Sequence, residues 1–305
     1  MRDSDSRGSA GGSTTRRGTL KLFGGLFGTP FGIGASAYGL DRSYQDNDGD
    51  GIPDSLERST EFNDWIHSIF GDQFSGLDPT RRDLLVDVRY VGGITVSEQT
   101  RQLIVELFRT NGIHMQWLEH PTRYDQSAFE RQYGYNAKRI LWSPRSFYRQ
   151  HIEPRLKNVA FQLVVVPGFA DGPHERKLYS PATATHGSGS GGYVNGLNTG
   201  NRAVVASRYS HEIEAKLILH EIAHYALCHS TDPANTGVMG TNEAADLMAD
   251  EWAKLREGLG AIRDTTGVDV LLRRCLWDEL QPAAFRLPPG VIDSVGCQGC
   301  QADDG

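Results

Sequence analysis

The sequence predicts an α/β (α+β) fold built on a twisted, mostly parallel sheet that carries one functional helix. Strand-like apolar runs at 84–91, 113–118 and 161–166 are the first observation, and a helical pattern at 97–107 between the first two is the second. The third is the almost unbroken apolar character of 161–166, which is typical of strands buried on both faces of a parallel sheet. A further strand is expected at 201–209.

The segments between and after these strands complete the predicted order. Residues 121–158 form a connection rich in aromatics and arginine, whose aromatics should pack on the sheet while the arginines face water. The Gly- and Ser-rich stretch 183–200 is expected to be a mobile surface loop. The strand at 201–209 is then expected at the sheet edge, where an extended peptide can add itself. Apolar spacing predicts helices over 212–228 and 242–259.

Composition narrows the class of protein. The 305 residues include 38 acidic and 31 basic side chains, for a formal net charge of −7. This charge argues against nucleic acid as the main partner, and the length predicts one sizeable domain with tails. We expect a monomer. The four cysteines, Cys228, Cys275, Cys297 and Cys300, are too few for a small disulfide scaffold and allow three pairings.

The first 37 residues differ from the rest of the chain. They hold five basic and two acidic side chains, a net charge of +3, so the remainder carries −10. The pair Arg16-Arg17 precedes an apolar run diluted by glycines, and Ala35-Ser36-Ala37 supplies a small-residue cleavage pattern, so the segment resembles a twin-arginine export signal. We expect a secreted chain that begins near Tyr38. No stable membrane insertion is expected, since no stretch reaches about 18 apolar residues.

An acidic loop, DNDGDGIPDSLE, opens the expected mature chain at residues 46–57. It places oxygen donors at loop positions one, three, five, seven, nine and twelve, and Gly51 at position six permits a sharp turn. Calcium takes six to eight oxygens at about 2.3 to 2.6 Å, so this pattern predicts a structural Ca²⁺ ion. The expected calcium ligands are Asp46, Asp48, Asp50, the carbonyl of Ile52, Asp54 and Glu57. The loop resembles the DxDGDGIPD loops of secreted calcium-binding repeats.

The strongest chemical signal is His220-Glu221-Ile222-Ala223-His224, within the predicted helix 212–228. Two histidines four residues apart stand on one helix face and can bind one Zn²⁺ ion. Zinc at such a site makes water nucleophilic near neutral pH, and Glu221 can take the proton of that water as the general base. The expected reaction is the hydrolysis of a peptide bond.

The segment HEIAHYALCHSTDPANTGVMG, which starts at His220, resembles the metzincin clan of zinc metallopeptidases. The resemblance implies a metzincin-like fold, zinc ligands at His220 and His224, a general base at Glu221 and a methionine turn at Val238-Met239-Gly240. It also implies a third histidine ligand, and His229 stands one residue before the usual position. His229 can reach the metal if the helix ends near Cys228.

Two other residues compete with His229 as the third ligand. Asn242-Glu243-Ala244 resembles the segment that supplies a glutamate ligand in the gluzincins, and Asp232 is the remaining candidate. The sequence therefore predicts an exported zinc endopeptidase that acts on peptide or protein substrates. The alternative is a catalytically degenerate, calcium-dependent surface or binding protein on the same scaffold. The expected parts are a signal (1–37), a calcium-loop segment (38–77), a metallopeptidase domain (78–290) and a Cys-containing tail (291–305).

Overall fold

The computed structural model describes residues 46–170, 172, 175–180, 192–198, 200–207, 210–224, 226–227, 232–241 and 244–263. The predicted signal, the C-terminal tail, the four cysteines, His229 and Glu243 lie outside the described residues.

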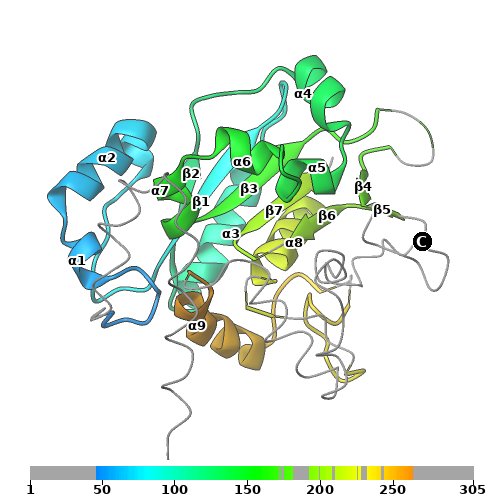
Figure 1. Cartoon of the computed structure of the whole chain (residues 1–305). Coiled ribbons are helices and arrows are strands. Elements are labelled where there is room, and N and C mark those ends of the chain that lie inside the picture. The colour runs from blue at the N-terminus through cyan, green and yellow to red at the C-terminus, as the bar shows by residue number, and fades with distance from the viewer. Residues whose placement is uncertain are drawn as a thin grey trace, which may run out of the picture. The chain divides into compact units, whose positions relative to one another are not determined.

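The described chain begins with helices, then has one strand, one helix and one strand, followed by four helices, five strands and two final helices (Figure 1). The helices are α1 (Asp54–Glu57), α2 (Thr60–Phe70), the 3-10 turn η2 (Gly71–Gln73), α3 (Glu98–Thr110), α4 (Gln126–Tyr133), α5 (Ala137–Leu141), α6 (Phe147–His151), α7 (Pro154–Val159), α8 (His211–Ala223) and α9 (Ala249–Arg263). The strands are β1 (Asp83–Tyr90), β2 (His114–Glu119), β3 (Ala160–Val166), β4 (Leu178–Ser180), β5 (Gly192–Val194), β6 (Gly196–Asn198) and β7 (Arg202–Ala206).

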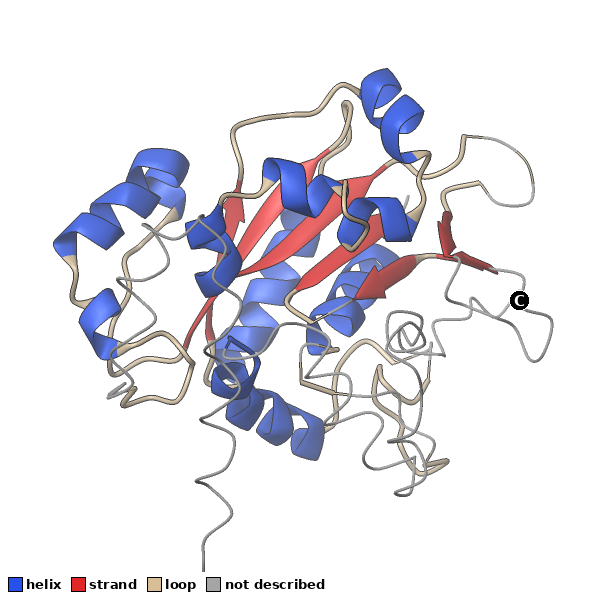
Figure 2. Ribbon diagram, in the orientation of Figure 1, coloured by secondary structure: helices blue, strands red, loops and turns tan. Residues whose placement is uncertain are grey.

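The main sheet has five strands in the order β2-β1-β3-β7-β6 (Figure 2). The pairs β1–β2, β1–β3 and β3–β7 are parallel, and β6 alone runs antiparallel, against β7. The strands β4 and β5 form a separate antiparallel pair. This arrangement confirms the predicted α/β class with a mostly parallel central sheet.

Helices cover both faces of this sheet. The helices α3 and α8 lie behind it in Figure 1, and α5, α6 and α7 lie in front. Alternate residues of β1 supply the two cores, because successive side chains of a strand point to opposite faces. Leu84, Val86 and Val88 pack with residues of α3, α8 and α9, whereas Leu85 packs with residues of α2 and α4–α7.

Local signals in the sequence set the boundaries of α3. The side chain of Ser97 accepts a hydrogen bond from the backbone N–H of Thr100 and so caps the first turn. Thr100, Ile104 and Phe108 are spaced four apart and form the buried face of the helix. The predicted strands at 84–91, 113–118 and 161–166 also form, as β1, β2 and β3, within one residue at each end.

The expected surface loop over 183–200 is wrong for residues 192–198. These residues form β5 and β6, and Val194 and Leu197 are buried. Glycine is common in this stretch and hides any alternation of apolar residues. Strand pairing needs only backbone groups, and β5 pairs with β4 while β6 pairs with β7. The strand predicted at 201–209 forms as β7 (Arg202–Ala206), but it is not the sheet edge, because β6 covers that side.

The helix predicted over 212–228 ends earlier than expected. The helix α8 stops at Ala223, where the backbone N–H of Leu227 bonds to the carbonyl of Ala223 and the imidazole of His224 bonds to the carbonyl of Leu227. A side chain that satisfies a backbone carbonyl just past the helix competes with another helical turn.

The helix predicted over 242–259 begins late, at Ala249. The preceding backbone is used elsewhere, since the carbonyl of Asp246 accepts from the N–H of Val238, and Glu251 accepts from the N–H of Met248. Leu247, Trp252 and Leu255 are buried in the core with α3 and α8. Across the described residues, no helix combines the length and the apolar character that a bilayer crossing requires.

A buried ion pair lies on the α4–α7 face of β1. The side chains of Arg89 and Asp87 are 1% and 0% exposed, and Arg89 Nη2 donates to Asp87 Oδ2 at 2.9 Å. Arg89 Nη1 also donates to the hydroxyl of Tyr124 (3.2 Å) and the carbonyl of His151 (3.3 Å). Burial raises the pKa of Asp87 to about 6, although Arg89 opposes this rise. The pair thus ties the connection between β2 and β3 to the centre of the sheet.

Candidate active site

The helix α8 carries His220 and Glu221, and His224 follows directly as its C-cap residue; the predicted chemistry depends on these three residues. Ile218, Leu219 and Ile222 are fully buried in the core shared with β1 and α3, so the helix cannot rotate without opening that core. The buried face therefore fixes the orientation of the helix. His220 and His224 must lie close together at its C-terminal end if they are to bind one ion.

The two imidazoles converge. His224 Nε2 lies 3.0 Å from His220 Nε2, and the ring centroids are 4.5 Å apart at an interplanar angle of 87°. The other nitrogen of each ring is bound to a backbone carbonyl. His220 Nδ1 bonds to the carbonyl of Val238 at 3.0 Å, and His224 Nδ1 bonds to the carbonyl of Leu227 at 3.1 Å.

These contacts determine which nitrogen can bind a cation. A carbonyl only accepts hydrogen bonds, so in a neutral ring the proton lies on Nδ1 and the lone pair lies on Nε2. Burial lowers the pKa of His220, which favours the neutral form. Two lone pairs facing each other at 3.0 Å repel, and a cation between them removes the repulsion. Histidine ligands of metals are oriented in this way by a hydrogen bond from the second ring nitrogen.

Glu221 is 0% exposed and lies against the edge strand β6. A methyl carbon added at Gly196 would stand 2.5 Å from Glu221 Oε1, so the carboxyl group contacts the backbone of that glycine. Asn198 Nδ2 donates to the backbone carbonyl of Glu221 at 2.9 Å. Sequence reasoning missed Gly196 and Asn198, because both lie in the stretch expected to be a loop, and neither belongs to a motif.

The contact with Gly196 gives a testable expectation. Replacing Gly196 by Ala should push the Glu221 carboxylate aside, because the glycine has an ordinary backbone angle and only space limits it. A displacement of about 1 Å at a catalytic group can cost about 100-fold in rate. In the zinc peptidase that the sequence predicts, peptide hydrolysis should fall by that order at unchanged zinc content. Gly93→Ala is the matched control, since a Cβ there meets nothing within 4 Å, and equal activities of the two variants would contradict the expected role.

The predicted methionine turn lies beside the first histidine. Residues 238–240 form a turn in which the N–H of Gly240 and that of Thr241 both bond to the carbonyl of Gly237. Met239 is buried, and the Val238 carbonyl holds the His220 ring as described. The turn therefore orients a histidine through the backbone of Val238.

The described part of the chain does not show which residue is the third predicted zinc ligand. His229 and Glu243 lie outside them. Asp232 is described and exposed, and its Oδ1 accepts from the backbone N–H of Ala234 at 2.8 Å. No third His, Cys, Asp or Glu within the described residues completes a three-donor group with His220 and His224, so the structure does not bring Asp232 to the two rings.

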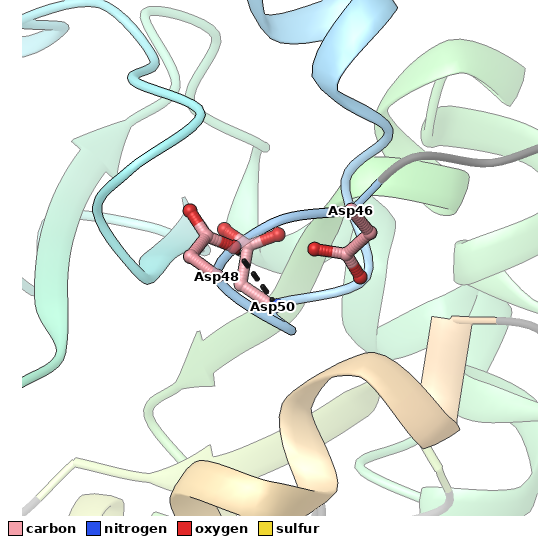
Figure 3. Close-up of side chains that lie close together, drawn as sticks. All are labelled: Asp46, Asp48 and Asp50. Carbon is pink, nitrogen blue, oxygen red and sulfur yellow. Dashed lines mark hydrogen bonds between the residues drawn. The ribbon is translucent and has the colours of Figure 1, made fainter.

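The acidic loop of residues 46–57 bonds to its own backbone. Asp46 accepts from the N–H groups of Gly49 and Gly51, at 2.8 and 2.9 Å. Asp48 Oδ1 accepts from the N–H of Asp50 at 3.1 Å (Figure 3). The carboxyl oxygens of Asp46, Asp48 and Asp50 lie within 4.8 Å of one another, so the structure brings together the first three predicted calcium ligands.

The last two carboxylates of the loop differ from each other. Asp54 accepts from the backbone and side-chain amides of Asn47, at 2.9 and 2.6 Å, and from Arg58 at 3.0 Å. Glu57 instead groups with Asp50 and with Asp83, a residue outside the loop that the sequence pattern did not include. Ile52 is fully buried and anchors the loop.

Charge is concentrated at this loop. Burial raises the pKa of Glu57 to about 8, and the neighbouring Asp50 adds to the rise. Burial likewise raises the pKa of Asp48 to about 7, again with a contribution from Asp50. Crowded carboxylates of this kind are unfavourable without a compensating cation, and an all-oxygen donor set suits a hard cation such as Ca²⁺.

Comparison with known proteins adds little to these observations. No protein-family model matches the chain, and no curated protein matches it. Among solved structures, the archaemetzincin of Methanopyrus kandleri is similar, with 16% sequence identity and a TM-score of 0.39 over 59% of this chain and 96% of that one. Similarity at this level does not assign a function.

Proposed function

We propose that this chain is an exported zinc-dependent endopeptidase. The observation that carries the proposal is the approach of His220 Nε2 and His224 Nε2 to 3.0 Å, with both Nδ1 atoms bonded to carbonyls and Glu221 adjacent. Neutral imidazole nitrogens on one helix are the donors that zinc prefers in hydrolytic sites. The residues present therefore fit the metal.

Each residue has a separate task in this proposal. A zinc ion bound by His220 and His224 would supply Lewis acidity, which makes water nucleophilic near neutral pH and polarises a carbonyl. Glu221 takes a proton from the attacking water and passes it to the leaving amine nitrogen, so the peptide C–N bond breaks as a C–O bond forms. The buried position of Glu221 beside β6 holds its carboxyl group for both transfers.

We assign the third zinc ligand to His229, with Glu243 as the alternative. The assignment is supported by the resemblance of the 220–240 segment to the metzincin pattern. It is also supported by the early end of α8, since the chain leaves the helical path before residue 229. The helical rotation that would carry His229 away from the other two rings therefore does not apply.

The substrate is proposed to be an extended peptide. The strand β6 ends the sheet order, and Gly196 lies next to Glu221, so the sheet edge runs beside the expected general base. Backbone groups at such an edge can pair with an added strand whatever its side chains. We also propose that the chain is secreted by the twin-arginine route, acts as a monomer and holds a structural Ca²⁺ ion in the 46–57 loop.

Zinc content tests the metal site directly. The purified chain should hold about one zinc ion, and His220→Ala or His224→Ala should reduce this to below about one tenth, because each removes a ligand. His211→Ala is the matched control, since His211 lies on the same helix and is half exposed. The measurement is elemental analysis together with thermal unfolding, which separates loss of metal from loss of fold.

Two outcomes would contradict this proposal. Zinc retained in folded His224→Ala protein would place the metal elsewhere. Calcium found without zinc in the wild-type chain would favour the calcium-dependent binding protein over the peptidase.

A further inference from the structure

Glu57 is an unusual carboxylate. The Glu57 residue is 2% exposed, and neither of its carboxyl oxygens, Oε1 and Oε2, has a hydrogen-bond partner within the described part of the chain. A buried carboxyl group without partners is costly to the folded state, and its presence indicates that something else compensates it. Its carboxyl group lies within 4.8 Å of those of Asp50 and Asp83, both of which are also buried.

Asp83 connects this group to the central sheet. It is the first residue of β1, and its backbone N–H donates to Asp50 Oδ2 at 2.7 Å. The neighbouring Arg82 donates through Nε to the backbone carbonyl of Asp48 at 2.8 Å. The loop is therefore attached to the start of β1 at two points, and both attached residues are predicted calcium ligands.

The Asp83 carboxylate has its own partners. Arg81 Nε donates to Asp83 Oδ1 at 3.1 Å, and His114 Nδ1 lies 2.6 Å from the same oxygen. The Asp83 oxygens are thus occupied, unlike those of Glu57. Asp83 can act on a cation in two ways. Its negative charge attracts the cation, and its backbone N–H holds the Asp50 carboxylate in position.

We propose that the cation site of the 46–57 loop extends to β1, so that one divalent ion held by Glu57, Asp50 and Asp48, with Asp83 as a positioning residue, joins the N-terminal segment to the central sheet. This proposal rests on the calcium loop of the proposed function. Two oxygens on one Ca²⁺ ion at about 2.3 to 2.6 Å can be up to about 5 Å apart. The group Asp46, Asp48 and Asp50 and the group Asp50, Glu57 and Asp83 each lie within 4.8 Å, and Asp50 belongs to both. The bound ion would then fix the segment α1–α2 to the start of β1, and we call this ion-mediated link the calcium lock.

The calcium lock changes what calcium should do to stability. Without the ion, Glu57 is a cost to the folded state, whereas with the ion it is a ligand. Calcium should therefore raise the melting temperature of the full chain with increasing concentration. Glu57→Gln should melt higher than wild type in calcium-free buffer near neutral pH, because folding then no longer has to bury an ionised carboxylate or protonate it, yet it should gain almost nothing from calcium.

Asp83→Asn tests the extension to the sheet. Calorimetric titration of calcium-depleted full chain with CaCl₂, at constant zinc, should give a dissociation constant about 10- to 100-fold weaker than wild type, the range expected for an outer-sphere residue. Asp83→Glu keeps the charge and should recover part of the affinity. Asp72→Asn is the matched control, since Asp72 is exposed and outside the group.

The outcomes separate the two proposals. If wild type binds no calcium, the calcium loop itself is wrong. If wild type binds calcium and Glu57→Gln does not, but Asp83→Asn matches Asp72→Asn within about twofold, the loop holds the ion alone and the extension to β1 is wrong. If Asp83→Asn does not fold, a calcium increment in Glu57→Gln equal to that of wild type would still overturn the calcium lock.

Discussion

Replacing Glu221 by Gln should lower the turnover number for peptide hydrolysis by about 10²- to 10⁴-fold, the usual contribution of a general acid–base group. Gln has nearly the same size as Glu, so it fits the buried space against Gly196. Gln cannot accept a proton from water, and the side chain at position 221 is not an expected metal ligand. Zinc content and melting temperature should therefore stay close to those of wild type. Cleavage of fluorescently labelled casein measures the loss.

Glu212→Gln is the matched control for this experiment. Glu212 lies on the same helix, and its side chain is 77% exposed. It undergoes the same chemical change far from the buried carboxylate, so its activity should equal that of wild type. Full activity of Glu221→Gln at full zinc content would remove Glu221 from the mechanism. Loss of zinc in that variant would instead make Glu221 a metal ligand.

Replacing Asp87 by Ala should lower the free energy of unfolding by about 3–5 kcal/mol, because it leaves the Arg89 guanidinium buried without its carboxylate. The remaining contacts of Arg89, to the Tyr124 hydroxyl and the His151 carbonyl, do not neutralise its charge. A loss of this size is a large part of the 5–15 kcal/mol that stabilises a typical domain. The loss in the free energy of unfolding is measured by urea unfolding, with the same m-value fitted to each variant.

Two variants separate the ion pair from other effects at the same place. The double variant Asp87→Leu with Arg89→Met replaces both charges by apolar groups, so it should recover most of the lost stability. Asp72→Ala removes an exposed carboxylate and should change the free energy of unfolding by less than about 0.5 kcal/mol. If Asp87→Ala unfolds at the same urea concentration as Asp72→Ala, the buried pair contributes little and the expectation is wrong.

Several elements could be predicted from local pattern alone. The apolar runs that become β1, β2 and β3 are short and bounded by turn residues, and the buried face of α3 follows its four-residue spacing. The approach of His220 and His224 also follows from local geometry, since residues four apart on a helix lie on one face. These features depend only on neighbours in the sequence, which is why pattern reasoning finds them.

Other features could not be predicted in this way. Strand β6 has little local signal because it is stabilised by pairing with β7 and by burial of Leu197. The end of α8 at Ala223 depends on a side-chain bond from His224 to Leu227. The first is a pairing made by the tertiary fold, and the second is a local side-chain bond that residue spacing does not reveal; each outweighs the average preference of the residues.

The sequence by itself determined the α/β class, the helical placement of His220, Glu221 and His224, and the donor pattern of the acidic loop, because each depends on spacing along the chain. Only the tertiary structure decided that β6 is the sheet edge, that Gly196 contacts Glu221, and that Asp83 joins the loop carboxylates. The physical reason is distance along the chain. Gly196 is 25 residues from Glu221 and Asp83 is 26 from Glu57, so only the path of the folded backbone brings each pair together.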